Sequence, residues 1–122
     1  MGKVNFTQIE ALLLLDESSE EKILPYVMKR FSEQLPEYCE QMKQFAQKKK
    51  GLEASYLAHK LKSSAGTLGL VEEEELCIKI ELLFRQGKLD DALKLISLLC
   101  SLSEEDLAEI QRYLSGQQKI AA

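Results

Sequence analysis

The sequence predicts an all-α protein, built as an antiparallel up-and-down four-helix bundle with a short N-terminal accessory helix. Apolar residues recur with helical spacing along most of the 122-residue chain, and no segment gives a convincing strand pattern. Only two prolines and six glycines interrupt the pattern. Short connections between long amphipathic segments favour antiparallel neighbours. We expect a single domain over residues 1–122, with an ordered core at about residues 5–115.

The first helix is predicted at about residues 5–15. Ser18, followed three residues later by Glu21, forms a capping-box pattern that predicts the start of the second helix. Helical spacing persists through Pro36, so we favour one long second helix over two shorter ones. The lysines and glycine of Lys48–Gly51 close it, with the glycine expected in a left-handed cap. A solvated cap explains this run better than an anion-binding patch does.

The third helix is predicted at about residues 52–68 and ends at Gly69. Four carboxylates, Glu72–Glu75, open the fourth helix at the positive end of its dipole, and Gly87 ends it. Adjacent carboxylates on one helix diverge, so we interpret this cluster as a helix start and not as a metal site.

The last segment, residues 89–114, has helical spacing throughout. Ser103 and Asp106 could cap a new helix within it, so the segment fits one bent helix or a split pair equally well. Residues after Ser115 are expected to fray.

Composition excludes several classes of function. A net charge of −4 and a pI near 5.1 give no support to nucleic-acid binding, which needs a basic surface. The longest apolar run, residues 11–15, is too short to cross a membrane, and no secretory signal is evident. We expect a cytoplasmic monomer.

The three cysteines are Cys39, Cys77 and Cys100. They are too few and too scattered for a disulfide framework or a metal site, and an odd count suits a reducing compartment. Each lies near the apolar stripe of a predicted helix, so we interpret all three as small buried hydrophobes.

His59 is the only histidine in the chain. At 100° per residue it lies about 200° from Leu57, while Lys62, Ser63 and Gly66 lie roughly on its own side. The third helix therefore presents an imidazole, an ammonium group and small side chains opposite its leucines. This arrangement suits work on a phosphoryl group better than packing, although a surface histidine without a function is the alternative.

The segment Ala58–Gly69, AHKLKSSAGTLG, resembles the signature of histidine-containing phosphotransfer (HPt) domains. The similarity continues downstream through Leu76–Glu81 and upstream at Phe31 and Leu35–Glu37, so it covers most of the chain. It implies a helical bundle that carries a phosphoryl group on a histidine. The group would come from the phospho-aspartate of a receiver domain and pass to another receiver, without autonomous catalysis by this chain.

The resemblance implies that His59 is phosphorylated on the ring nitrogen remote from the backbone. Glu81, at the family's matching position, would accept a hydrogen bond from the other nitrogen; a solvated carboxylate is the alternative. Lys62, one turn from His59, would stabilise the phosphoryl oxygens, unless it is an ordinary exposed lysine. Ser63 and Gly66 would leave clearance around the ring. Glu81 favours a protonated imidazole and Lys62 opposes it, and the sequence does not decide between them.

Two positions depart from the family pattern. Ser63 occupies a position where glycine is common, so it either narrows the approach to the ring or hydrogen-bonds the phosphoryl group. Glu73 occupies a position where an apolar residue is usual, which puts the local core packing in question.

The sequence contains no glycine-rich phosphate loop and no carboxylate set suited to Mg²⁺, so we expect neither cofactor nor metal in this chain. In the family, the receiver domain of a response regulator supplies Mg²⁺ and most of the catalytic groups. The expected partners are receiver domains and hybrid or other histidine kinases. Receivers would dock on an apolar patch, for which Phe6, Ile9, Leu12 and Leu13 are candidates; burial against the bundle end is their alternative.

Two rival functions fit the same sequence. One is a non-phosphorylated helical adaptor that docks to receivers or kinases. The other is the phosphoacceptor module of a larger histidine kinase. The sequence gives neither the cognate partner nor the direction of phosphoryl flow.

Overall fold

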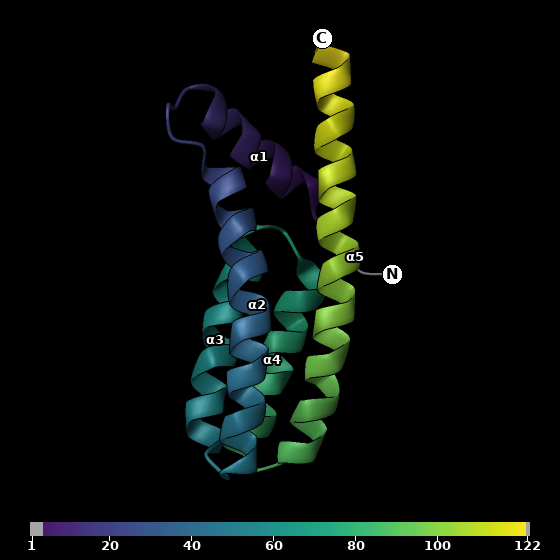
Figure 1. The fold of residues 1–122 in the computed structure, drawn as a ribbon. Helices are drawn as coiled ribbons and strands as arrows, with labels where there is room; N and C mark the ends of the chain where they lie inside the picture. Colours follow the sequence, from purple (N-terminus) through teal and green to yellow (C-terminus); the bar gives the residue numbers. More distant parts are fainter. Residues whose placement is uncertain (1–3, 122) are drawn as a thin grey trace.

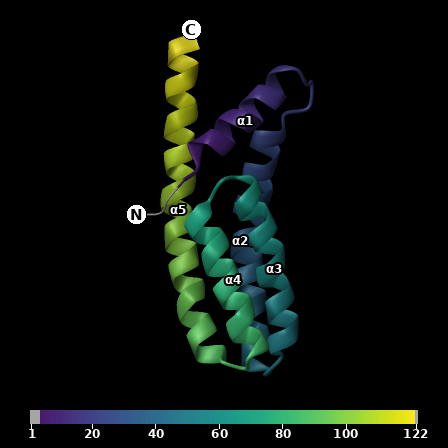
Figure 2. The same cartoon turned by 180° about the vertical axis from the view of Figure 1, so that it is seen from behind.

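The computed structural model describes residues 4–121, with side chains through residue 116. Its five helices are α1 (Phe6–Glu17), α2 (Ile23–Gln47), α3 (Gly51–Thr67), α4 (Val71–Arg85) and α5 (Leu89–Ala121). Helices α2 to α5 run alternately up and down as a bundle, and α1 slants across its end between α2 and α5 (Figures 1 and 2). Among the described residues the only β-type contact is an isolated bridge between Val4 and Leu70. The prediction of an all-α bundle with an accessory helix is confirmed.

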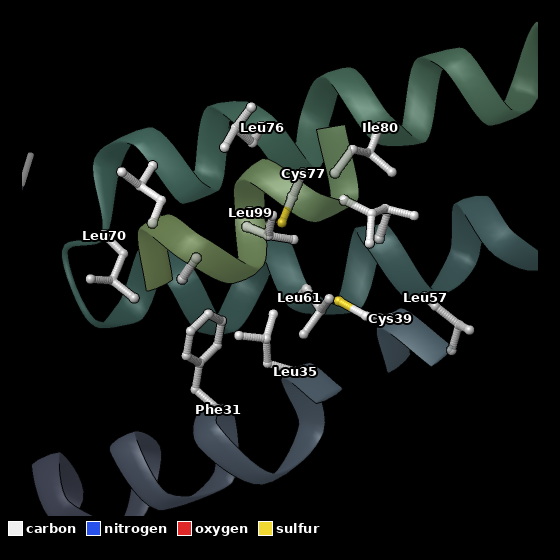
Figure 3. Close-up of a cluster of buried hydrophobic side chains, with 14 of the residues drawn as sticks. Phe31, Leu35, Cys39, Leu57, Leu61, Leu70, Leu76, Cys77, Ile80 and Leu99 are labelled. Atoms are coloured by element: carbon white, nitrogen blue, oxygen red, sulfur yellow. The ribbon is translucent and has the colours of Figure 1, made fainter. Parts of the chain in front are cut away.

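The apolar face of each bundle helix points into one shared core. Figure 3 shows Phe31 and Leu35 of α2, Leu61 of α3, Ile80 of α4 and Leu99 of α5 converging there. Burial of each such side chain contributes about 1.5–3 kcal/mol, so the helical spacing of apolar residues is what closes the bundle. None of the helices in the described part of the chain is long and apolar enough to cross a membrane.

The start of α2 differs from the sequence prediction. The capping box of Ser18 and Glu21 does not form, because α2 begins at Ile23 and the Asp16 carboxylate caps it instead. Asp16 Oδ1 accepts a hydrogen bond from the Ile23 amide at 2.6 Å, and Oδ2 accepts one from the Leu24 amide at 3.0 Å. A carboxylate at the end of α1 thus satisfies two free amides of the next helix.

Helix α2 continues without a break through Pro36, as predicted. Its end differs from prediction, because Lys49 takes the left-handed conformation with φ of 58° and Gly51 already belongs to α3. A Cβ atom at Gly51 would collide with the Phe84 carbonyl oxygen. The glycine therefore permits the close approach of α3 to the end of α4 and is not a helix cap.

Helix α5 is one helix, so the split at Ser103 and Asp106 does not occur. Both residues lie in the middle of α5, and their side chains are buried against the bundle. The helix also continues past Ser115, where fraying was expected. Its outer part packs against α1, where the Tyr113 hydroxyl donates a 2.8 Å hydrogen bond to Glu10. This contact extends the bundle beyond its four-helix core.

Glu73 of α4 does not behave like the other carboxylates that open this helix. Its side chain is completely buried, together with Asp106 and Ser103 of α5. Both Glu73 carboxyl oxygens, Ser103 Oγ and Asp106 Oδ2 lack a hydrogen-bond donor among the described residues. Glu73 does lie in the first turn of α4, as the helix-start interpretation predicts, but it occupies the position where the family pattern places an apolar residue, and the structure buries its carboxyl group there.

Candidate functional site

His59 projects from α3 away from the core, in agreement with its helical phase. Half of its side-chain surface is exposed, whereas Leu57 and Leu61 on the opposite side of α3 are buried. The imidazole is therefore accessible to another protein while the leucines hold α3 in place.

Glu81 of α4 meets this imidazole across the α3–α4 contact. Its Oε2 lies 3.3 Å from His59 Nδ1. Its Oε1 lies 3.1 Å from Nη2 of Arg85, one turn further along α4. Only 13% of the Glu81 side chain is exposed, so both carboxylate oxygens are engaged and their orientation is fixed. Nε2, the ring nitrogen remote from the backbone, is not used by this contact.

Arg85 was not identified from the sequence. The signal for it was present, since Glu81 and Arg85 are four residues apart on a predicted helix and therefore share a face. The spacing alone did not indicate a role for Arg85, because such pairs are common on solvated helices. Only the structure places Glu81 against His59.

Lys62 lies one turn after His59 and is half-buried. No ion pair to its ammonium group occurs among the described side chains. Burial raises the pKa of Cys77 on α4 to about 12, and the charge of Lys62 acts against that rise. The Lys62 side chain is therefore close enough to α4 for its charge to act on Cys77.

Ser63 lies on the other flank of His59, toward α2. It lines a shallow depression of about 230 Å³ between α2 and α3. The remaining lining residues are Tyr26, Val27, Arg30, Gln34, Ser64 and Thr67. Arg30 of α2 was not predicted to lie near Ser63, because the two residues have no helical spacing relation in the sequence; the packing of α2 against α3 brings both to this depression.

Gly66 faces α4. A Cβ atom there would collide with a carboxylate oxygen of Glu74, so this glycine makes room for a contact between helices. Clearance around a phosphoryl group at Gly66 stays a prediction.

The four docking candidates of α1 divide into two groups. Ile9 and Leu12 are buried in the core, so the alternative of burial holds for them. Phe6 and Leu13 are half-buried, and the Phe6 ring packs against Tyr113 with 4.8 Å between centroids. Apolar side chains that are exposed near this end and along α3 are Leu14, Leu15, Ile23, Tyr26, Leu52 and Tyr56.

An accessible histidine on a helical bundle, with a carboxylate at its Nδ1 and a lysine one turn along the same helix, is the arrangement of a phosphoryl-carrier type of site. The sequence model of the family described as Hpt domain matches residues 27–116, and the chain belongs to this family. Hpt domains carry phosphoryl groups in phosphorelays and interact with receiver domains. Searches of curated proteins and of solved structures found no significant match.

Proposed function

We propose that this chain accepts a phosphoryl group on Nε2 of His59 from the phospho-aspartate of a receiver domain and passes it to a second receiver. The observation that supports this most directly is the 3.3 Å contact between His59 Nδ1 and Glu81 Oε2. When Nδ1 carries the proton and donates it to the carboxylate, the lone pair resides on Nε2. That lone pair is the nucleophile, and half of the side chain is open to a partner.

In the transfer step, Nε2 attacks phosphorus and the bond between phosphorus and the aspartyl oxygen breaks. The aspartate leaves as a carboxylate, and the ring retains its Nδ1 proton and gains positive charge. Glu81 stabilises this charge, while Arg85 binds the other carboxylate oxygen and holds it in place. The same contacts serve the reverse direction.

Lys62 is proposed to stabilise the three phosphoryl oxygens, because its ammonium group has no ion pair among the described side chains. Ser63 would offer a hydroxyl to the same oxygens. The Mg²⁺ of the transfer would come from the receiver, and this chain would need no cofactor of its own.

We propose that receivers dock on the face formed by α2 and α3. Tyr56 and Tyr26 are 60% and 63% exposed, and Leu52 near Tyr56 is 70% exposed. Tyr56 and Leu52 line an apolar groove of about 450 Å³, and Tyr26 lines the depression that contains Ser63. Exposed aromatic side chains are frequent hot spots of protein interfaces, and here they lie on both sides of His59. Receivers of phosphorelays and histidine kinases would be met in the cytoplasm.

The deciding experiment mixes the full chain with a phosphorylated cognate receiver, found by profiling the receivers of the source organism. Wild type is expected to give an acid-labile, base-stable phosphoprotein, and His59→Gln is expected to give none. Because the chain has one histidine, this variant removes the only acceptor of that type. The thermal midpoint of His59→Gln serves as the control for folding.

Equal labelling of wild type and His59→Gln would refute the carrier assignment. A receiver that binds the chain without labelling it would instead support the rival function, a non-phosphorylated adaptor. Tyr56→Ala is the companion variant, since loss of receiver binding with an unchanged thermal midpoint would locate the docking face on α3.

A further inference from the structure

Cys39 of α2 and Cys100 of α5 form a close pair. Their Sγ atoms lie 3.3 Å apart, although the residues are 61 positions apart in the sequence. Figure 3 shows the Cys39 sulfur pointing into the core near Leu61. Cys39 is buried and Cys100 is half-buried, so the pair lies where the core meets the surface between two helices. The interpretation of these two residues as independent buried hydrophobes is therefore incomplete.

The surroundings of the two thiols differ. The hydrogen bond with Cys39 lowers the pKa of Cys100 to about 7, and the charge of Lys43 acts in the same direction. The same hydrogen bond and burial raise the pKa of Cys39 far above its usual value. Cys100, which is also the more exposed of the two, is thus the thiol that ionises more readily, and thiolates are the reactive form of cysteine.

We propose that Cys39 and Cys100 are a redox-active pair that closes to an intramolecular disulfide between α2 and α5 when the protein meets a peroxide. One thiol is partly exposed to solvent, and the other lies beside it on a neighbouring helix. The pair therefore provides both an attacking and a resolving sulfur. The cysteine pair lies between α2 and α5, whereas the contact of His59 with Glu81 lies between α3 and α4. Oxidation of the pair is therefore independent of the proposed phosphotransfer function.

The chemistry balances with hydrogen peroxide as oxidant. The Cys100 thiolate attacks one peroxide oxygen, the O–O bond breaks, and the departing hydroxide takes up a proton to form water. This leaves a sulfenic acid on Cys100. The Cys39 sulfur then attacks the Cys100 sulfur, the S–O bond breaks, and the leaving hydroxide takes the Cys39 proton as a second water. Two thiols and one peroxide thus give one disulfide and two waters.

Closure needs the sulfur atoms to approach from 3.3 Å to about 2.05 Å, the length of a disulfide bond. The bond would link two helices that are distant in sequence and so restrict the unfolded chain. An oxidised protein is therefore expected to unfold at a higher temperature than the reduced one.

Cys77 is the matched internal control. It is completely buried, and burial raises its pKa to about 12, with the charges of Glu73 and Glu74 adding to the rise. It is expected to remain a thiol under conditions that oxidise the pair, because thiols react with peroxide as thiolates.

The test treats the reduced full chain with hydrogen peroxide, blocks remaining thiols with iodoacetamide after unfolding, and maps the peptides by mass spectrometry. The expected product has Cys39 linked to Cys100, Cys77 alkylated, and a thermal midpoint raised by about 5 °C or more before blocking. Dithiothreitol should reverse the shift. Cys77→Ser should behave like wild type, whereas Cys100→Ser should show neither the disulfide nor the shift.

The proposal is overturned if peroxide leaves both Cys39 and Cys100 alkylatable. It is also overturned if Cys100 proceeds to a sulfinic acid without pairing, or if the disulfide found joins two chains or includes Cys77. Peptide mapping of wild type alone decides among these outcomes, so a variant that fails to fold does not weaken the test.

Discussion

Glu81 and Glu73 lie eight residues apart on α4 and occupy opposite environments. Glu81 has an imidazole on one oxygen and a guanidinium on the other, at 3.3 and 3.1 Å. Glu73 forms no ion pair among the described residues, and the buried carboxyl group of Asp106 on α5 lies beside it. The comparison teaches that a place on one helix does not fix the environment of a carboxyl group. The side chains that it meets decide that environment, and these come from α3 and α4 at Glu81 but from α5 at Glu73.

The electrostatics of the two regions follow from these neighbours. Burial, and then hydrogen bonding with Asp106 and its charge, raises the pKa of Glu73 to about 8. Burial also raises the pKa of Asp106, and the further charges that act on the pair are those of Glu72, Glu105 and Glu109. Two carboxylates have no hydrogen to donate, so the contact becomes a hydrogen bond only when one is protonated. A neutral acid is also the closest substitute for the apolar residue usual at position 73.

The largest expected effect concerns the pH dependence of stability. The pKa of Glu73 is about 8 when folded, against about 4.5 for an ordinary glutamate. The folded state therefore binds more protons between these values, so the free energy of unfolding should fall as pH rises from about 5 to 8. The fall should reach several kcal/mol, because one pKa unit corresponds to ~1.4 kcal/mol. Urea unfolding across this pH range measures it.

Glu73→Gln tests the origin of that fall. Its amide can donate to the Asp106 carboxylate without titrating, so the variant should lose stability less steeply and exceed wild type at pH 8. Glu75→Gln, at an exposed glutamate of α4 whose charge does not act on the pair, is the control and should retain the wild-type slope. Parallel curves for wild type and Glu73→Gln would show that the buried pair does not titrate.

A second prediction concerns Glu81, the other half of the comparison. Glu81→Ala removes the acceptor of the His59 Nδ1 proton, so transfer to His59 should slow about tenfold or more, since a hydrogen bond to a charged group contributes about 1.5–3 kcal/mol. The initial rate of labelling by a phosphorylated receiver measures the effect. Glu75→Ala, an exposed glutamate of α4, should transfer normally. A normal rate for Glu81→Ala would show that Glu81 takes no part in transfer.

A third prediction concerns Lys62, which lies one turn after His59 on α3. Lys62→Ala should slow labelling of His59 by about tenfold, because it removes a charge near the phosphoryl oxygens. The thermal midpoint should stay close to wild type. Lys48→Ala, an exposed lysine at the end of α2, is the control for net charge. An undiminished rate in Lys62→Ala would remove this residue from the site.

The smallest effect is expected for Arg85. Its guanidinium is more than half exposed, and exposed ion pairs contribute about 0.2–1 kcal/mol, so Arg85→Ala should slow transfer by at most about fivefold. The initial rate of labelling by a phosphorylated receiver measures the effect. A rate equal to that of wild type would show that the ion pair with Glu81 does not contribute to transfer.

Sequence reasoning succeeded where the deciding interactions are local. Helical spacing through Pro36 correctly gave one long helix, and the phase of His59 against its leucines correctly placed the ring outside the core. It failed at Ser18, whose cap-like pattern is equally local, because Asp16 offers the α2 amides a better acceptor. The pattern at Ser103 left one helix and a split pair open, and the structure shows one helix.

The sequence by itself determined which face of each helix is apolar, because that depends only on the repeat of about 3.6 residues per turn. It therefore determined the bundle and the outward His59. Only the tertiary structure decided which side chains of different helices meet, as Glu81 meets His59 and Cys39 meets Cys100. Those meetings depend on the axial shift and rotation of each helix, which the packing of the whole core sets at once.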